Sequence, residues 1–257
     1  MRFTTRSAAF TLIVLGALGA IVTLSLLDID RARPAAATLP EVVPVEIALL
    51  VDTSGSVDEF EYQLQQEGYV RAFQSDELTE LIERQGGIAV AYIEWSSVNH
   101  QVVRLGWTRL DTPADCHAFA AQIAALGRQA QGETRMAPAL QFAADQIASN
   151  GFVGLKRVID VSGDGRCQNY DYYLENEGTH EDYGTPWDEV IANISGDVDE
   201  VNGICITVSA EVTDFYRDVL PQGEKSFMMQ VFDFTQFEGA ILAKMRREIG
   251  TLPGMFD

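Results

Sequence analysis

Residues 47–56 read Ile-Ala-Leu-Leu-Val-Asp-Thr-Ser-Gly-Ser, and this stretch decides the fold class. The continuous apolar run from Ile47 to Val51 is typical of a strand that is buried on both faces. A polar turn follows it, opening with Asp52, and a helix is expected to begin near Val57. A buried strand, a tight polar turn and a helix are the first unit of a doubly wound α/β sheet.

The rest of the chain continues this alternation. Helices separate most of the expected strands, whereas residues 88–95 and 101–110 are close enough to form a hairpin. Further strands are expected at 157–162, 204–209 and 227–232, and helices at 113–126, 137–147, from about 187, and 237–249. This order predicts an α/β fold with a mostly parallel six-stranded sheet, one antiparallel strand, and helices on both faces. No repeat or low-complexity linker follows Pro44, so residues 41–257 are expected to form a single domain.

The first 40 residues have the pattern of an export segment. Arg2 and Arg6 precede an uncharged apolar stretch, residues 8–27, which is long enough to cross a bilayer as a helix. The small residues 35–37 also fit a signal peptidase site, so a cleaved signal peptide and a membrane anchor both remain open. Either alternative places the body of the protein outside the cytoplasm, in the periplasm or cell envelope, because the first arginines would stay inside.

Composition and charge exclude several classes of protein. The chain has 257 residues, of which 47% are hydrophobic, so it can bury a sizeable core and is not disordered. Its net charge is −20, and residues 1–40 carry four Arg and two Asp, which leaves −22 on the remainder. Such a surface repels polyanions, so a nucleic-acid partner is excluded, and membrane contact is expected only through residues 8–27.

The three cysteines do not indicate a metal site or a disulfide framework. The sequence has no Cys-x-x-Cys pair among Cys116, Cys167 and Cys205, and the three histidines are scattered along the chain. In an oxidising compartment one disulfide could form in three ways, and the sequence does not choose among them.

Oxygen-bearing side chains gather where the strands are expected to end. The turn after the first strand presents Asp52, Ser54 and Ser56, a later helix start presents Thr134, and Asp164 follows a buried strand. Carboxylates and hydroxyls are hard donors suited to Mg²⁺, or to Mn²⁺ or Ca²⁺, and the carboxyl ends of parallel strands lie at one edge of a sheet. The simpler alternative for the hydroxyls of Ser56 and Thr134 is helix N-capping. Two carboxylates and three hydroxyls carry too little charge to saturate a divalent ion, so one coordination position of the ion stays open. An acidic side chain of a partner could fill that position.

These residues resemble the von Willebrand factor type A (vWA) family and its metal-ion-dependent adhesion site (MIDAS), in a bacterial branch without an assigned activity. The resemblance covers about residues 43–250 and includes the Asp-x-Ser-x-Ser turn, the later Thr and the Asp after the fourth strand. It implies that Ser54, Ser56 and Thr134 touch the metal, and that Asp52 and Asp164 act largely through bound waters. Many members read Thr-Asp-Gly at the last position, whereas this chain reads Ser162-Gly163-Asp164-Gly165, which leaves Asp160 as a second choice.

The long polar loop after Asp164 is a candidate specificity element. Its Arg166, Tyr170 and Tyr172 would supply charge and contact area beside the metal, unless the loop is only a solvated connection. The sequence therefore predicts a non-enzymatic, extracytoplasmic module that binds a carboxylate of a protein partner through a divalent cation. A metal-dependent hydrolase is the runner-up, although no histidine or glutamate has a readable spacing from the ligands. A structural envelope subunit with a vestigial site is the third alternative.

Overall fold

The computed structural model describes residues 39–129, 131–167 and 185–250. Contacts divide the chain into residues 1–38 and 39–257. The export segment predicted at 1–40 lies almost entirely outside the described residues, as do Tyr170 and Tyr172. Among the described helices, none combines the length and apolar character needed to cross a membrane.

The second unit is built on a six-stranded sheet with the order β3-β2-β1-β4-β5-β6. All neighbouring strands are parallel except β2 and β3, which pair antiparallel. The strands are β1 (Glu41–Asp52), β2 (Ile88–Trp95), β3 (Gln101–Leu110), β4 (Phe152–Gly163), β5 (Glu200–Ile206) and β6 (Met228–Val231). The chain leaves β1 toward β2 and β3 and later returns to β4, so the strand order reverses at β1 and β4. The predicted fold class is confirmed.

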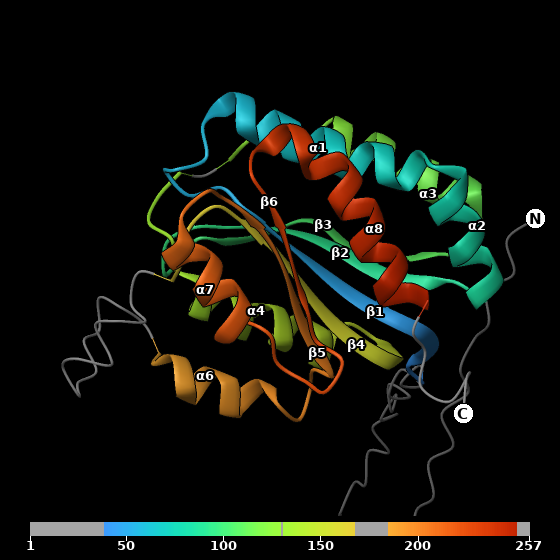
Figure 1. Cartoon of the computed structure of the whole chain (residues 1–257). Coiled ribbons are helices and arrows are strands. Elements are labelled where there is room, and N and C mark those ends of the chain that lie inside the picture. The colour runs from blue at the N-terminus through green and yellow to red at the C-terminus, as the bar shows by residue number, and fades with distance from the viewer. Residues whose placement is uncertain (1–38, 130, 168–184, 251–257) are drawn as a thin grey trace, which may run out of the picture. The chain divides into compact units, whose positions relative to one another are not determined.

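Helices cover both faces of this sheet, as Figure 1 shows. One face carries α1 (Glu59–Gln74), α2 (Asp76–Gln85), α3 (Pro113–Ala124) and α8 (Phe237–Gly250), which follows the short η2 (Phe234–Gln236). The other face carries α4 (Met136–Ser149), α6 (Trp187–Ile194) and α7 (Ala210–Asp218). The sheet thus separates two hydrophobic cores. Strand β1 is buried between them from Val45 to Asp52, which explains its unbroken apolar run.

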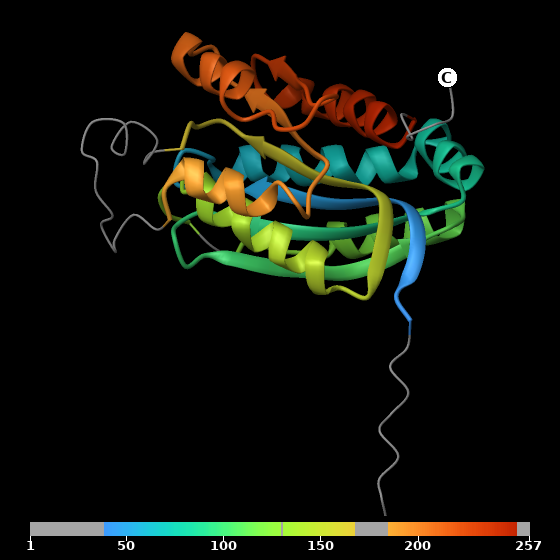
Figure 2. The same ribbon diagram turned by 90° about the horizontal axis from the view of Figure 1, so that it is seen from below.

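Two strands begin earlier than the sequence predicts, because their first residues include polar side chains that hid the strand pattern. Strand β4 begins at Phe152, not at residue 157, and its first residues pair with Glu41–Val43 of β1. Figure 2 shows the two strands running side by side and bending together near their N-terminal ends. Strand β5 spans Glu200–Ile206, earlier than the predicted 204–209, because the buried Asn202 bonds to other buried polar groups.

The helix boundaries also correct the prediction. Helix α1 begins at Glu59, and its N-cap is Asp58, whose carboxylate accepts a bond from the N–H of Glu61 at 2.8 Å. The N-capping alternative for Ser56 is therefore wrong. The N-cap of α4 is Arg135, without a side-chain cap, so the same alternative for Thr134 is also wrong. Helix α7 was not predicted, because its apolar residues are few and mixed with charged ones.

The cysteines lie in both cores. Cys116 belongs to the core under α1 and α3, whereas Cys167 and Cys205 belong to the core on the other face. All three side chains are buried. Since the sheet separates the two cores, Cys116 is kept apart from the other two, and two of the three pairings are excluded in this fold.

Candidate functional site

The candidate site begins at the turn between β1 and α1. Asp52 is the last residue of β1 and is fully buried. Its Oδ1 accepts a hydrogen bond of 2.7 Å from the backbone N–H of Ser54, which closes a tight turn. Thr53 faces β2, where its N–H and hydroxyl both donate to the carbonyl of Trp95, at 2.9 and 3.1 Å. The turn is thereby fixed to the edge of the sheet where the parallel strands end.

A row of hydroxyl and carboxylate oxygens crosses this edge. The Oγ atoms of Ser54 and Ser56 lie 3.1 Å apart, and Ser56 Oγ donates to Asp164 Oδ1 at 2.6 Å. Asp164 directly follows β4, so residues 108 positions apart in the sequence meet here. A single hydroxyl that touches both another hydroxyl and a carboxylate is the arrangement expected of a set of oxygen ligands.

Thr134 reaches the same place from the loop before α4. A Cβ atom added to Gly165, the residue after Asp164, would lie 3.2 Å from Thr134 Oγ1, so the Thr134 side chain packs against the backbone of Gly165. The preceding Gly132 accepts a 2.7 Å hydrogen bond from the N–H of Gly55 in the first turn. The three segments predicted to carry the site are therefore in contact, and all five predicted ligands lie in them.

The carboxylates of the site are held in an environment that disfavours their charge. Burial, and then the nearby charge of Asp164, raise the pKa of Asp52 to about 7. Burial also raises the pKa of Asp164. Asp52 Oδ2 is a buried atom for which the described residues provide no hydrogen-bond partner. A buried acceptor without a donor, beside a second carboxylate, fits a divalent cation well.

Two further residues support the turn, and sequence reasoning missed both. Gln65 of α1 donates to the carbonyl of Asp52 at 3.1 Å and accepts from the Ser162 hydroxyl at 2.8 Å. Arg128 donates to the carbonyls of Thr53 and Ser54 at 3.0 and 2.9 Å. The sequence feature that could have pointed to Gln65 was a polar residue on the apolar, buried face of a helix. The loop position of Arg128 gave no comparable signal.

The remaining predicted residues have other surroundings. Asp160, the second choice for the acidic ligand, is fully buried and paired with Lys244 of α8 at 2.6 Å. Since that ion pair occupies its carboxylate, Asp164 is the better candidate. Arg166 follows Asp164 closely and pairs with Glu211 at 2.8 Å. Its predicted neighbours Tyr170 and Tyr172 lie outside the described residues.

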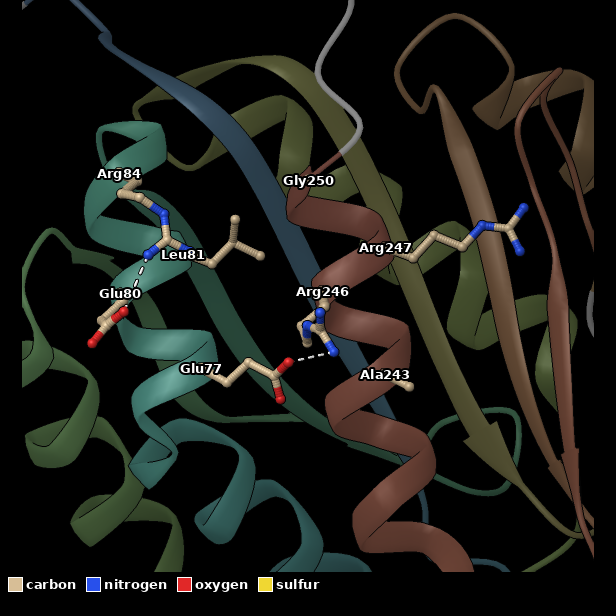
Figure 3. A pocket seen from close by; sticks show the side chains of 8 residues that line it. All are labelled: Glu77, Glu80, Leu81, Arg84, Ala243, Arg246, Arg247 and Gly250. Atoms are coloured by element: carbon tan, nitrogen blue, oxygen red, sulfur yellow. Dashed lines mark hydrogen bonds and ion pairs between the residues drawn. The ribbon is translucent and has the colours of Figure 1, made fainter.

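Other parts of the described chain offer less to a metal or ligand. Among these residues, no three His, Cys, Asp or Glu side chains gather into a metal-binding group, and the candidate site instead joins two carboxylates with three hydroxyls. A groove of about 540 Å³ lies between α2 and α8 (Figure 3). Ion pairs between Glu80 and Arg84 and between Glu77 and Arg246 border it. Because α2 leads into the start of β2, the groove lies at the opposite edge of the sheet from the candidate site.

Sheet order and the Asp-x-Ser-x-Ser turn at the end of the first strand are those of a vWA-like α/β fold, and solved structures agree with that fold. A von Willebrand factor type A protein from Catenulispora acidiphila has a TM-score of 0.52 and 16% identity. The match covers 82% of this chain and 43% of that protein. The chain belongs to the family described as "Protein of unknown function (DUF1194)", whose model matches residues 42–253. The resemblance inferred from the sequence is confirmed at the level of the fold.

Two further similar structures are those of a mussel byssus protein and a bacterial pilus adhesin. Proximal thread matrix protein 1 from the mussel byssus, "with zinc occupied MIDAS motif", has a TM-score of 0.52 and 14% identity, covering 80% of this chain and 48% of its own. The pilus adhesin SpaC from Lactobacillus rhamnosus GG has a TM-score of 0.54 and 13% identity. The match covers 80% of this chain and 30% of the adhesin. The chain thus spans less than half of each of these three proteins. A comparison with the curated proteins finds no match.

Proposed function

We propose that this protein is an extracytoplasmic, non-enzymatic binding module that holds a divalent cation at the C-terminal edge of its sheet. Asp52, Ser54, Ser56, Thr134 and Asp164 would hold the ion. When bound, the ion would offer an open coordination position to a carboxylate of a protein partner. The binding energy for the partner would come from that bond and from the surface around it.

The observation that carries this proposal is the row of oxygens from Ser54 to Asp164 beside the unpaired Oδ2 of Asp52. The contacts of 3.1 and 2.6 Å hold the ligating groups together before any ion arrives. Asp52 Oδ2 is buried and has no hydrogen-bond partner among the described residues. A site that concentrates buried acceptors without donors disfavours its own empty state, and a cation relieves that cost.

The donor set favours a hard ion. All five side chains offer oxygen, and none offers the nitrogen or sulfur that Zn²⁺ prefers. Mg²⁺ suits such a site, since it takes few protein ligands and keeps several waters, with Mn²⁺ and Ca²⁺ as alternatives. The zinc-occupied MIDAS named for the mussel protein supports a divalent cation in general.

The location and partner follow from the sequence and the kind of similar protein. The uncharged stretch 8–27 after two arginines supports export, and the similarity to a pilus adhesin supports a role at the cell surface. A body of charge −22 repels most acidic proteins. A partner would therefore carry its binding carboxylate within neutral or basic surroundings, so that the cation is the main point of attraction.

Calorimetric titration of Mg²⁺ and Mn²⁺ into the chelator-treated protein tests the metal site. We expect one ion per chain, binding that is lost in Asp164→Asn, and binding that is retained in Asp145→Asn. Asp145 is a suitable control because it is exposed, lies in α4 and accepts a hydrogen bond from Gln141. Equal metal binding by the wild type and Asp164→Asn would contradict the proposal.

Capture of partners from a cell-envelope extract tests the function. A partner retained with Mg²⁺ and released by chelator would support metal-dependent binding, and the Asp164→Asn protein should retain none. Retention that is unaffected by chelator would instead favour the structural-subunit alternative. Turnover of a phosphoester or peptide panel that disappears in Asp164→Asn would favour the hydrolase.

A further inference from the structure

Two glycines in neighbouring strands form a slot for Tyr216. Tyr216 lies in α7 and is fully buried. A Cβ atom on Gly203 of β5 would lie 2.9 Å from Tyr216 Cδ1, and one on Gly163 of β4 would lie 2.7 Å from its hydroxyl oxygen. These separations are too short for packed atoms, so a larger residue at either position would displace the tyrosine.

The slot brings the Tyr216 hydroxyl to Asp52. The same added Cβ atom on Gly163 would also lie 2.7 Å from Asp52 Oδ2. The phenol oxygen and the carboxylate oxygen therefore lie at equal distances from one point beside the β4 backbone. This crowding accounts for the departure from Thr-Asp-Gly in this chain, because a threonine at position 163 would force the two oxygens away.

Both oxygens are buried, and neither finds a hydrogen-bond partner among the described residues. They are also complementary, since a phenol donates a hydrogen bond and a carboxylate accepts one. An unpaired hydroxyl in a hydrophobic core costs free energy, which a phenylalanine in the same slot would avoid. Packing alone therefore accounts for the ring of Tyr216 but not for its hydroxyl.

We propose that Tyr216 is a positioning residue of the metal site, whose hydroxyl donates to Asp52 Oδ2 through one bridging water. The inference rests on the proposed function in that Asp52 is taken to belong to a metal site. The other carboxylate oxygen, Oδ1, already accepts a 2.7 Å bond from the N–H of Ser54. Donors on both oxygens would restrict rotation of the carboxylate and hold it ready for the ion.

Metal titration of Tyr216→Phe tests the positioning role. Partners of this kind typically change metal affinity by 10–100-fold, and we expect Mg²⁺ binding to weaken about tenfold. Tyr92→Phe is the matched control, because Tyr92 is also fully buried with an unpartnered hydroxyl but belongs to the other core. Its binding should stay within about twofold of wild type. Unchanged binding by Tyr216→Phe, while wild type binds, would overturn the inference.

A second measurement needs no metal and separates this inference from the proposed function. In the chelated protein with ¹³Cζ-labelled tyrosine, the resonance that disappears in Tyr216→Phe is assigned to Tyr216. Replacing Asp52 by Asn should shift that resonance, since the bridging water loses a charged acceptor, and should leave the Tyr92 resonance in place. A Tyr216 resonance that does not move would overturn the inference, even if the wild type binds Mg²⁺.

Discussion

Asp52 is expected to destabilise the metal-free protein, so Asp52→Asn should make that protein more stable at pH 8. The pKa of Asp52 is raised from 3.8 to about 7 by burial and by Asp164. The folded state therefore holds its proton more tightly than the unfolded state. Between these two values the free energy of unfolding falls as the pH rises, and above pH 7 the full loss is present. Replacing the carboxylate by a neutral amide removes that loss.

The size of the effect follows from the two pKa values. Each pH unit between them corresponds to about 1.4 kcal/mol, so the charged carboxylate costs roughly 4 kcal/mol at pH 8. The amide introduced by Asp52→Asn would itself be buried with incomplete hydrogen bonding, which costs about 1–3 kcal/mol. The net gain expected for this substitution is therefore about 1–3 kcal/mol at pH 8. At pH 4.5 the carboxylate costs only about 1 kcal/mol, so the gain should vanish.

Urea denaturation with chelator present measures this difference at both pH values. Asp145→Asn, an exposed replacement of the same type, should change the free energy of unfolding by less than about 0.5 kcal/mol at either pH. Saturating Mg²⁺ should reverse the order at pH 8, since only the wild type gains stability from the ion. An Asp52→Asn protein that is no more stable than wild type at pH 8 would refute the assignment of Asp52 as a buried charge that destabilises the metal-free protein.

Three further predictions concern the groups around the site and the core. Lys244→Met should lower the free energy of unfolding by about 3–5 kcal/mol in the same assay, because it leaves Asp160 and Glu248 buried together without their cation. Burial and Asp160 raise the pKa of Glu248 to about 8, so its stability contribution falls as the pH rises from 4.5 to 8, and Glu248→Gln should flatten that slope in a pH series. Arg128→Met should weaken Mg²⁺ binding several-fold by calorimetry, since it frees two carbonyls of the β1–α1 turn. A wild-type affinity in Arg128→Met would show that the turn is held without it.

The sequence predicted the parts of this protein that depend on local pattern. Strand β1 was readable because an unbroken apolar run of this kind is buried on both faces. Asp and Ser also fill ordinary turns, so the turn was readable only with its context, a buried strand before it, a helix after it and a later strand that ends in Asp-Gly. Strand β2 was placed at its observed residues for the same reason as β1, whereas the partly exposed edge strand β3 was placed by its short separation from β2. The order of helices and strands then brought Asp52 and Asp164 to one edge of the sheet.

The contacts that depend on tertiary packing could not be read in the same way. Strand β5 was placed too late because the buried Asn202 looks like a surface residue until Glu248 of α8 is brought against it. Gln65 and Tyr216 each reach the site from a helix that packs on the sheet, and no spacing in the sequence connects either of them with Asp52. The slot for Tyr216 depends on two glycines that the sequence alone would assign to flexibility.

The most direct test of a cation at this site is a crystal structure of the full chain grown with Mn²⁺, with anomalous diffraction used to locate the ion. We expect one strong anomalous peak at the C-terminal edge of the sheet, among the hydroxyls of Ser54, Ser56 and Thr134, with Asp52 and Asp164 around it. Under the same conditions, crystals of Asp52→Asn should show no peak there. A strong Mn²⁺ peak elsewhere, with none among these residues in the wild type, would show that they do not form the metal site.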